Sequence, residues 1–278
     1  MREISSSSAE VQVSPPWTQL PSDLTANILQ RLGSVEILKS ARKVCATWWK
    51  VCQDPAMWRV IKIISAEDNQ WECTTMCRCA VDRSQGQLID LTIAYFGDGE
   101  LLQYIVDRSS RLRRLTVACC YNISGTALTD SVKKLAELEE LRLFIPSILA
   151  ADIETIGISC PKLKSFTFNQ CQLEHLLSEF EPVGTVSSNE DALAIAKSMP
   201  NLCCLRLCAN KLDNEGLLAI LDGCPHLESR DLRQCFGVDI GGPLANRCWE
   251  QIKDLRVPSV SMQYFGLDLG EFYDDGFD

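Results

Sequence analysis

Closely spaced cysteines are the residues of this sequence that most resemble a chemical site. Cys73, Cys77 and Cys79 fall in one short segment, and thiolates at such spacing are common ligands of structural zinc. A closed zinc site needs a second pair of ligands, but His175 and His226 both lie far along the chain. Because Cys73 and Cys77 are one helical turn apart, we expect them on the buried face of a helix, with no metal and no cofactor.

A nucleophilic site would need a base beside its nucleophile and a third group to orient that base. Cys224 and His226 are close in sequence, but no orienting group accompanies them. The sequence Gly97-Asp98-Gly99 lacks the full pattern of a phosphate-binding loop and is more typical of a turn that opens a helix. The sequence therefore predicts no catalytic residue and a protein that is not an enzyme.

The composition is that of a globular protein. A chain of 278 residues with 46% hydrophobic content can form one or two folded units. No apolar stretch reaches the roughly 18 residues of a membrane span, and the first residues lack the apolar run of a secretory signal. We therefore expect no membrane contact and a location in the nucleus and/or cytoplasm. The 15 cysteines should then be reduced and behave as small apolar residues.

The net charge of −10 is unevenly distributed. Residues 1–64 hold eight Lys/Arg against five Asp/Glu, which leaves 19 against 32 for the rest of the chain. Nucleic-acid binding requires clustered positive charge, so the acidic body predicts no nucleic-acid partner. It is compatible with a basic protein partner, and also with a role in solubility alone.

A repeat dominates the sequence from Leu88 onward. The pattern Leu-x-x-Leu-x-Leu occurs seven times, and its first positions are 24, 26, 25, 39, 25 and 25 residues apart. These first positions are Leu88, Leu112, Leu138, Leu163, Leu202, Leu227 and Ile252. A period of 20–29 residues with this pattern predicts a leucine-rich-repeat solenoid with one short strand and one helix per repeat. The one long step predicts an insertion at about residues 176–190.

The other regions differ in composition. The Ser-rich start reads as a disordered tail, and three short helical patterns follow it, with Ser22 and Ser34 as expected N-caps. We predict a tail over 1–15, a small all-α unit over 16–63, a helical connector over 64–86, repeats over 87–265 and an acidic tail over 266–278.

The segment from Trp17 to Trp58 resembles an F-box. The matching residues are Leu20-Pro21, Leu24, Ile28-Leu29, Leu32, Ile37-Leu38, Val44-Cys45, Trp48, Asp54-Pro55 and Trp58, while Gly33 stands where many F-boxes have proline. The resemblance implies binding to a Skp-type adaptor and, through it, to a cullin. The contacts it implies are Trp17, Leu20, Pro21, Ile28, Leu32, Leu38, Val44, Cys45 and Trp48.

The repeats resemble the cysteine-containing class that accompanies F-boxes, with pairs such as Cys160-Pro161 and Cys224-Pro225 ahead of their strands. From about residue 16 to 257 the chain is similar to plant F-box/leucine-rich-repeat proteins of the Skp-interacting group. The expected fold is therefore α/β: a small all-α F-box followed by a short solenoid of about seven strand–helix repeats of the cysteine-containing type.

Strand residues of a solenoid alternate between the core and the concave surface. We therefore expect a polar concave face that binds a protein target. Its residues are Arg114, Thr116, Glu140, Arg142, Thr167, Arg206, Asp231, Arg233 and Arg256. Arg230 departs from the pattern, because it takes a position where every other repeat has Leu or Phe.

The resemblance implies the substrate-recognition subunit of a Skp–cullin–F-box ubiquitin ligase, with no chemistry of its own. A scaffold that binds the adaptor without recruiting a cullin is the alternative. The sequence does not name the target, or say whether the target must carry a modification.

Overall fold

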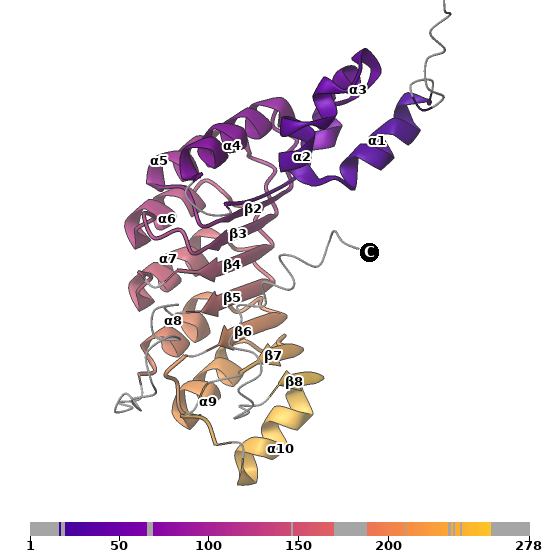
Figure 1. The fold of residues 1–278 in the computed structure, drawn as a ribbon. Coiled ribbons are helices and arrows are strands. Elements are labelled where there is room, and N and C mark those ends of the chain that lie inside the picture. Colours follow the sequence, from indigo (N-terminus) through magenta and orange to yellow (C-terminus); the bar gives the residue numbers. More distant parts are fainter. Residues whose placement is uncertain are drawn as a thin grey trace, which may run out of the picture.

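The computed structural model describes residues 17, 20–65, 69–145, 147–169, 188–208, 210–232, 235, 237–239 and 241–256. Short helices at the amino-terminal end lead into one parallel sheet, and longer helices line one side of that sheet (Figure 1). Among the described residues, no helix is long and apolar enough to cross a bilayer. The predicted insertion and the acidic tail lie mostly or wholly outside the described residues.

Over residues 20–58, the amino-terminal unit contains three α-helices and two 3-10 helices. They are α1 (Ser22–Gln30), α2 (Gly33–Lys39), η2 (Ala41–Lys43), α3 (Ala46–Val51) and η3 (Pro55–Trp58). Gly33 has a φ of +75°, a left-handed conformation that glycine adopts without strain, and it lets the chain turn between α1 and α2. Asp54 caps η3, because its Oδ1 accepts the Ala56 N–H at 2.9 Å.

The two expected serine caps were wrong. Helix α1 begins at Ser22 itself, with Pro21 in the capping position and no side-chain cap. Ser34 is buried inside α2, and its Oγ accepts the Lys62 backbone N–H at 3.2 Å instead. Ser34 therefore connects the amino-terminal unit to the first strand of the sheet.

The sheet has eight strands in sequential order, and every pair of neighbours is parallel. The strands are β1 (Val60–Ile64), β2 (Asp90–Ala94), β3 (Arg114–Ala118), β4 (Glu140–Phe144), β5 (Ser165–Asn169), β6 (Cys204–Cys208), β7 (Ser229–Asp231) and β8 (Asp254–Arg256). Strands β2–β8 lie in the seven predicted repeats, which confirms the solenoid. The sequence pattern did not predict β1.

A helix follows each of the strands β1–β7, and these helices cover the same side of the sheet (Figure 1). These helices are α4 (Gln70–Ser84), α5 (Gly99–Arg108), α6 (Gly125–Val132), α7 (Ala150–Ser159), α8 (Glu190–Ser198), α9 (Asn214–Gly223) and α10 (Gly242–Gln251). Polar side chains fix several of their starts. Asp98 Oδ1 accepts the Leu101 N–H at 2.8 Å, so the Gly97–Gly99 turn is a helix cap, as predicted.

The core runs through the whole solenoid as one apolar column between sheet and helices. Cys73 and Cys77 lie on the buried face of α4, which confirms the expectation of a helix face. The buried cysteines at the repeat turns point their thiols at backbone carbonyls of the preceding repeat. Cys224 Sγ lies 3.4 Å from Met199 O, and Cys235 Sγ lies 2.8 Å from Leu207 O. Small thiols therefore fill the tight space between successive repeats.

Candidate protein-binding surfaces

An apolar surface lies on the outside of the amino-terminal helices. Leu24, Ile28 and Leu32 are spaced four residues apart along α1 and the turn that follows it. With Trp17 and Val44 they form what we call the N-terminal apolar patch, and all five side chains are 42–48% exposed. Monomeric proteins rarely expose several large apolar side chains in one small unit unless a partner covers them.

Trp17 of this patch contacts a second tryptophan, Trp48. The Trp17 and Trp48 rings lie 5.6 Å apart at 62°, an edge-to-face contact. The Trp48 indole Nε1 is buried, and no described residue accepts its N–H. Cys45 is the N-cap of α3, where its Sγ accepts the Trp48 backbone N–H at 3.5 Å.

The other implied adaptor contacts differ in exposure. Pro21 is exposed, and Leu20 is half-buried. Leu38 is only 4% exposed and packs in the core, so in this conformation it offers a partner no surface. Leu24, which was not among the implied contacts, is 48% exposed on the same side as Ile28. We therefore replace Leu38 with Leu24 in the candidate surface.

The concave side of the sheet carries polar rows across the strands. The backbone register places Thr116, Arg142, Thr167 and Arg206 side by side on β3–β6. Both arginines are half-buried, whereas Thr116 and Thr167 are buried, as is Asp231 on β7. The accessible part of the predicted target surface is therefore smaller than the sequence suggested.

Ion pairs hold two of the predicted arginines. Arg114 Nε donates a hydrogen bond to Asp90 Oδ2 at 2.7 Å, and this bond raises the pKa of the guanidinium. Arg142 Nε lies 2.6 Å from Glu140 Oε1. Arg206 forms no ion pair with a described residue. Arg206 therefore presents a charge that a partner can neutralise.

Three predicted residues fall partly or wholly outside the described structure. Arg233 is not described, and only the backbone of Arg256 is, within β8. The backbone of Arg230, on β7, is also described. It aligns with Leu205 on β6 and with Leu255 on β8. The predicted register of this repeat is thereby confirmed, while the position of the Arg230 side chain is not described.

The sequence analysis missed an aromatic cluster at the carboxyl ends of β2 and β3. Tyr95 and Cys119 both have left-handed backbones, with φ of 65° and 53°. Burial raises the pKa of the Cys119 thiol, and hydrogen bonds from Tyr95 and Tyr121 oppose that rise. The two tyrosines are thus fixed around one thiol, just beyond the concave rows. The only sequence signal was their place directly after the strands.

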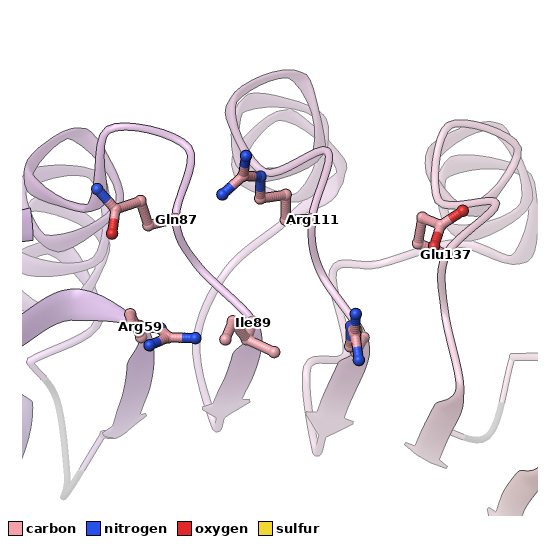
Figure 2. A pocket seen from close by; sticks show the side chains of 6 residues that line it. Arg59, Gln87, Ile89, Arg111 and Glu137 are labelled. Carbon is pink, nitrogen blue, oxygen red and sulfur yellow. The ribbon is translucent and has the colours of Figure 1, made fainter. Parts of the chain in front are cut away.

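A groove at the opposite, amino-terminal ends of the strands was also missed. It has a volume of about 510 Å³ and is lined by Arg59, Gln87, Ile89, Arg111, Arg113 and Glu137. Figure 2 shows Gln87 and Arg111 on the turns before their strands and Arg59 and Ile89 where strands begin. We call it the arginine groove. Its residues occupy two positions of successive repeats. Gln87, Arg111 and Glu137 come just before the first apolar residue of a repeat, and Arg59, Ile89 and Arg113 come just after it. The sequence signal was therefore divided among several repeats.

Several known proteins are similar to this chain. Residues 17–63 match the F-box-like family. The Arabidopsis thaliana F-box protein SKIP19 is 43% identical over 269 residues, covering 96% of this chain and 84% of that protein. Putative F-box/LRR-repeat protein 23 of the same plant is 45% identical over 249 residues. That alignment covers 88% of this chain but 54% of the relative, so the chain spans about half of that protein's length. A solved leucine-rich-repeat protein, LegL7 from Legionella pneumophila, aligns with a TM-score of 0.46 and 16% identity, covering 86% of this chain and 79% of that one.

Proposed function

Because the chain belongs to the F-box/leucine-rich-repeat proteins, we propose that it is the substrate-recognition subunit of a Skp–cullin–F-box ubiquitin ligase. The amino-terminal helices bind the Skp-type adaptor, and the concave side of the repeats binds a protein target. The reaction is accelerated by proximity, since holding the target near the ubiquitin-loaded enzyme raises its effective concentration.

The observation that carries this proposal is the N-terminal apolar patch. Its five large apolar side chains remain 42–48% exposed although the unit around them is folded. Burying the exposed half of one such side chain contributes on the order of 1 kcal/mol, so a partner that covers all five gains several kcal/mol.

Target binding is assigned to the concave rows around Arg142 and Arg206. Residue Thr167 lies between them in the register, and its buried Oγ1 has no partner among the described residues. Arginines near the centre of a protein interface often contribute most of the binding energy. We also propose that this action takes place in the nucleus and/or cytoplasm, where the described cysteines, all free thiols, would stay reduced.

The adaptor assignment is tested with Ile28→Asp and Leu32→Asp together. Both side chains are exposed, so the chain should fold normally, while two carboxylates in the interface should weaken adaptor binding at least about 100-fold. Binding is measured by biolayer interferometry with purified Skp-type adaptor. Ile158→Asp with Leu193→Asp is the control, because these apolar residues are also exposed but lie on α7 and α8.

Full adaptor binding by the Ile28/Leu32 variant would refute the assignment. Co-purification of the wild-type chain from plant extract then distinguishes the ligase receptor from the non-degradative scaffold. Recovery of adaptor and cullin together supports the receptor, whereas adaptor without cullin supports the non-degradative scaffold.

The target surface is tested by proximity labelling in cells. Arg142→Ala with Arg206→Ala should lose the proteins labelled by the wild-type chain, while adaptor labelling stays unchanged. If the same proteins are still labelled, the target binds elsewhere than on the concave rows.

A further inference from the structure

The arginine groove gathers positive charge on a chain that is acidic overall. Arg59 and Arg111 are exposed and form no ion pair with any residue that the structure describes. Arg113 supplies the third guanidinium of the groove, and its Nη1 lies 3.4 Å from Glu139 Oε1. Three guanidiniums thus line one groove, and two of them have no ion partner among the described residues. Figure 2 labels these two, Arg59 and Arg111.

The acidic residue of the groove does not cancel this charge. Glu137 Oε1 lies 2.6 Å from Lys162 Nζ, and the hydrogen bond from Lys162 holds the pKa of that carboxyl below its usual value. Lys162 therefore already neutralises Glu137 from the side of the next repeat. The net charge facing the groove remains positive.

The neutral residues of the groove add chemical selectivity. The Gln87 amide can donate a hydrogen bond, and the half-buried Ile89 side chain offers an apolar contact between the arginines. Guanidiniums bind carboxylates with two parallel hydrogen bonds. The groove is therefore suited to a peptide in which carboxylates alternate with apolar side chains.

We propose that the acidic segment Asp268–Asp278 of this same chain binds in the arginine groove. The segment reads DLGEFYDDGFD, with five Asp/Glu, three aromatic residues and no Lys or Arg. Its carboxylates match the arginines, and its aromatic residues match the apolar contact at Ile89. This inference is independent of adaptor or target binding.

The segment can reach the groove from the end of the sheet. Arg256 ends β8, which is five strands from β3, the strand that Arg113 precedes. At ~4.8 Å per strand this separation is about 24 Å, and the length of a short strand adds roughly 10 Å in the other direction. The 11 residues 257–267 span up to about 36 Å when extended. The tether is therefore long enough, and it keeps the segment close to the groove.

Such an arrangement would make the groove selective against weak acidic ligands. A tethered segment has an effective concentration on the order of 1 mM. If it binds with a Kd of roughly 100 μM, an external acidic peptide would bind about tenfold more weakly than to an empty groove. Only a ligand with higher affinity would displace the chain's own segment.

The test measures how a free copy of the segment binds the full-length chain. A fluorescein-labelled peptide of residues 266–278 is titrated against wild type and against a variant with Glu271→Gln, Asp274→Asn and Asp275→Asn. Fluorescence anisotropy should show about tenfold tighter binding to the variant, because its own segment no longer competes. Adding Arg59→Gln, Arg111→Gln and Arg113→Gln to that variant should remove binding.

A matched control neutralises three cations away from the groove, Arg108, Lys134 and Lys197, which lie on or next to the helices. The three control substitutions are also made in the acidic-segment variant, and the resulting chain should bind the peptide as tightly as that variant does. Equal peptide affinity for wild type and the acidic-segment variant would overturn the proposal, because the segment would then not occupy the groove. Binding that survives loss of the three groove arginines, or no binding at all, would overturn it as well.

Discussion

Arg230 stands at a core position of the sheet. Its backbone is in register with Leu205 and Leu255, and its neighbours Leu227 and Leu232 are buried. A charged group on such a path is costly unless it is paired or reaches water. Single residues of this kind reveal where the repeat pattern tolerates exceptions.

Replacing Arg230 with leucine tests that cost. Arg230→Leu restores the repeat pattern, so we expect a rise in Tm of roughly 2–4 °C by differential scanning calorimetry, equivalent to about 1 kcal/mol. Arg206→Leu, on the neighbouring strand but on the concave side, is the control and should not stabilise the chain. A lower Tm for Arg230→Leu would mean that this arginine has a partner that the fold needs.

The buried thiols predict a loss of stability at high pH. Burial raises the pKa of Cys77, Cys120 and Cys160 to about 12, whereas a thiol in the unfolded chain titrates near ~8.5. Between these values the unfolded chain loses a proton that the folded chain keeps. The contribution of these protonated thiols to the free energy of unfolding is therefore complete below about pH 8.5 and is lost as the pH rises toward 12.

The measurement is urea unfolding at pH 8 and pH 10. Cys120→Ala should lower the free energy of unfolding at both values but reduce its fall with pH, by up to ~1.4 kcal/mol per pH unit. Cys203→Ala, which removes a half-buried thiol, is the control for losing a cysteine. An unchanged pH slope in Cys120→Ala would show that this thiol does not stay protonated.

At the scale of elements, apolar spacing was enough to predict seven strands but not the first. The register aligns Ile61 and Ile63 with Leu91 and Ile93. Trp58 precedes Ile61 by three residues, as Leu88 precedes Leu91, so β1 follows the same pattern with tryptophan in the first position. The step from Trp58 to Leu88 is 30 residues, longer than the regular steps of 24–26 residues, and Trp58 also fits the F-box pattern. The strand was therefore hidden by a residue that serves both units.

The candidate sites were predicted unevenly for a physical reason. Alternation along a strand indicates which side chains leave the core, and this gave Arg142 and Arg206 correctly as accessible residues. It does not indicate how closely neighbouring strands cover a short side chain, so Thr167 was expected at the surface and is buried. The arginine groove joins residues from separate repeats, and spacing within one repeat cannot reveal it.

Helix caps that join two repeats should matter more than caps that serve one. Asp213 Oδ1 accepts two backbone N–H groups of α9 and also the Asn189 side chain at 2.8 Å. Asp98 caps α5 through a single N–H. We expect Asp213→Ala to lower the free energy of unfolding by about 2 kcal/mol and Asp98→Ala by about 1 kcal/mol in urea.

The surface carboxylate Asp130, within α6, provides the control, since Asp130→Ala should change the free energy of unfolding by less than about 0.5 kcal/mol. Equal losses for Asp213→Ala and Asp98→Ala would show that the bond between Asn189 and Asp213 adds nothing.

For the whole molecule, the F-box and the solenoid form one continuous body among the described residues. Trp58 is 1% exposed, and its Nε1 donates to Cys52 O at 3.0 Å. The same residue begins the first repeat, and Ser34 bonds the backbone of β1. The amino-terminal helices are therefore fixed directly to the first strand of the sheet at this point.

Trp58→Phe tests this connection. The variant loses the indole hydrogen bond and part of a buried aromatic side chain. The free energy of unfolding should therefore fall by about 1–3 kcal/mol. Circular dichroism and intrinsic fluorescence should still report one transition, because both units depend on the same contact. Trp71→Phe is the control, as Trp71 is 84% exposed on α4. Two separated transitions in the wild-type chain would contradict a single body.

Because the parallel strands follow one another in sequence order, the number of repeats sets how far each concave residue lies from β1. With ~4.8 Å between strands, Arg142 on β4 lies about 14 Å and Arg206 on β6 about 24 Å from β1, counted across the sheet. Each repeat contacts mainly its neighbours, so adding or deleting one whole repeat near β3 would shift both arginines by one step and leave their surroundings unchanged. In the proposed ligase, repeat number would thus select, in increments of ~5 Å, which lysines of a bound target come within range of ubiquitin transfer.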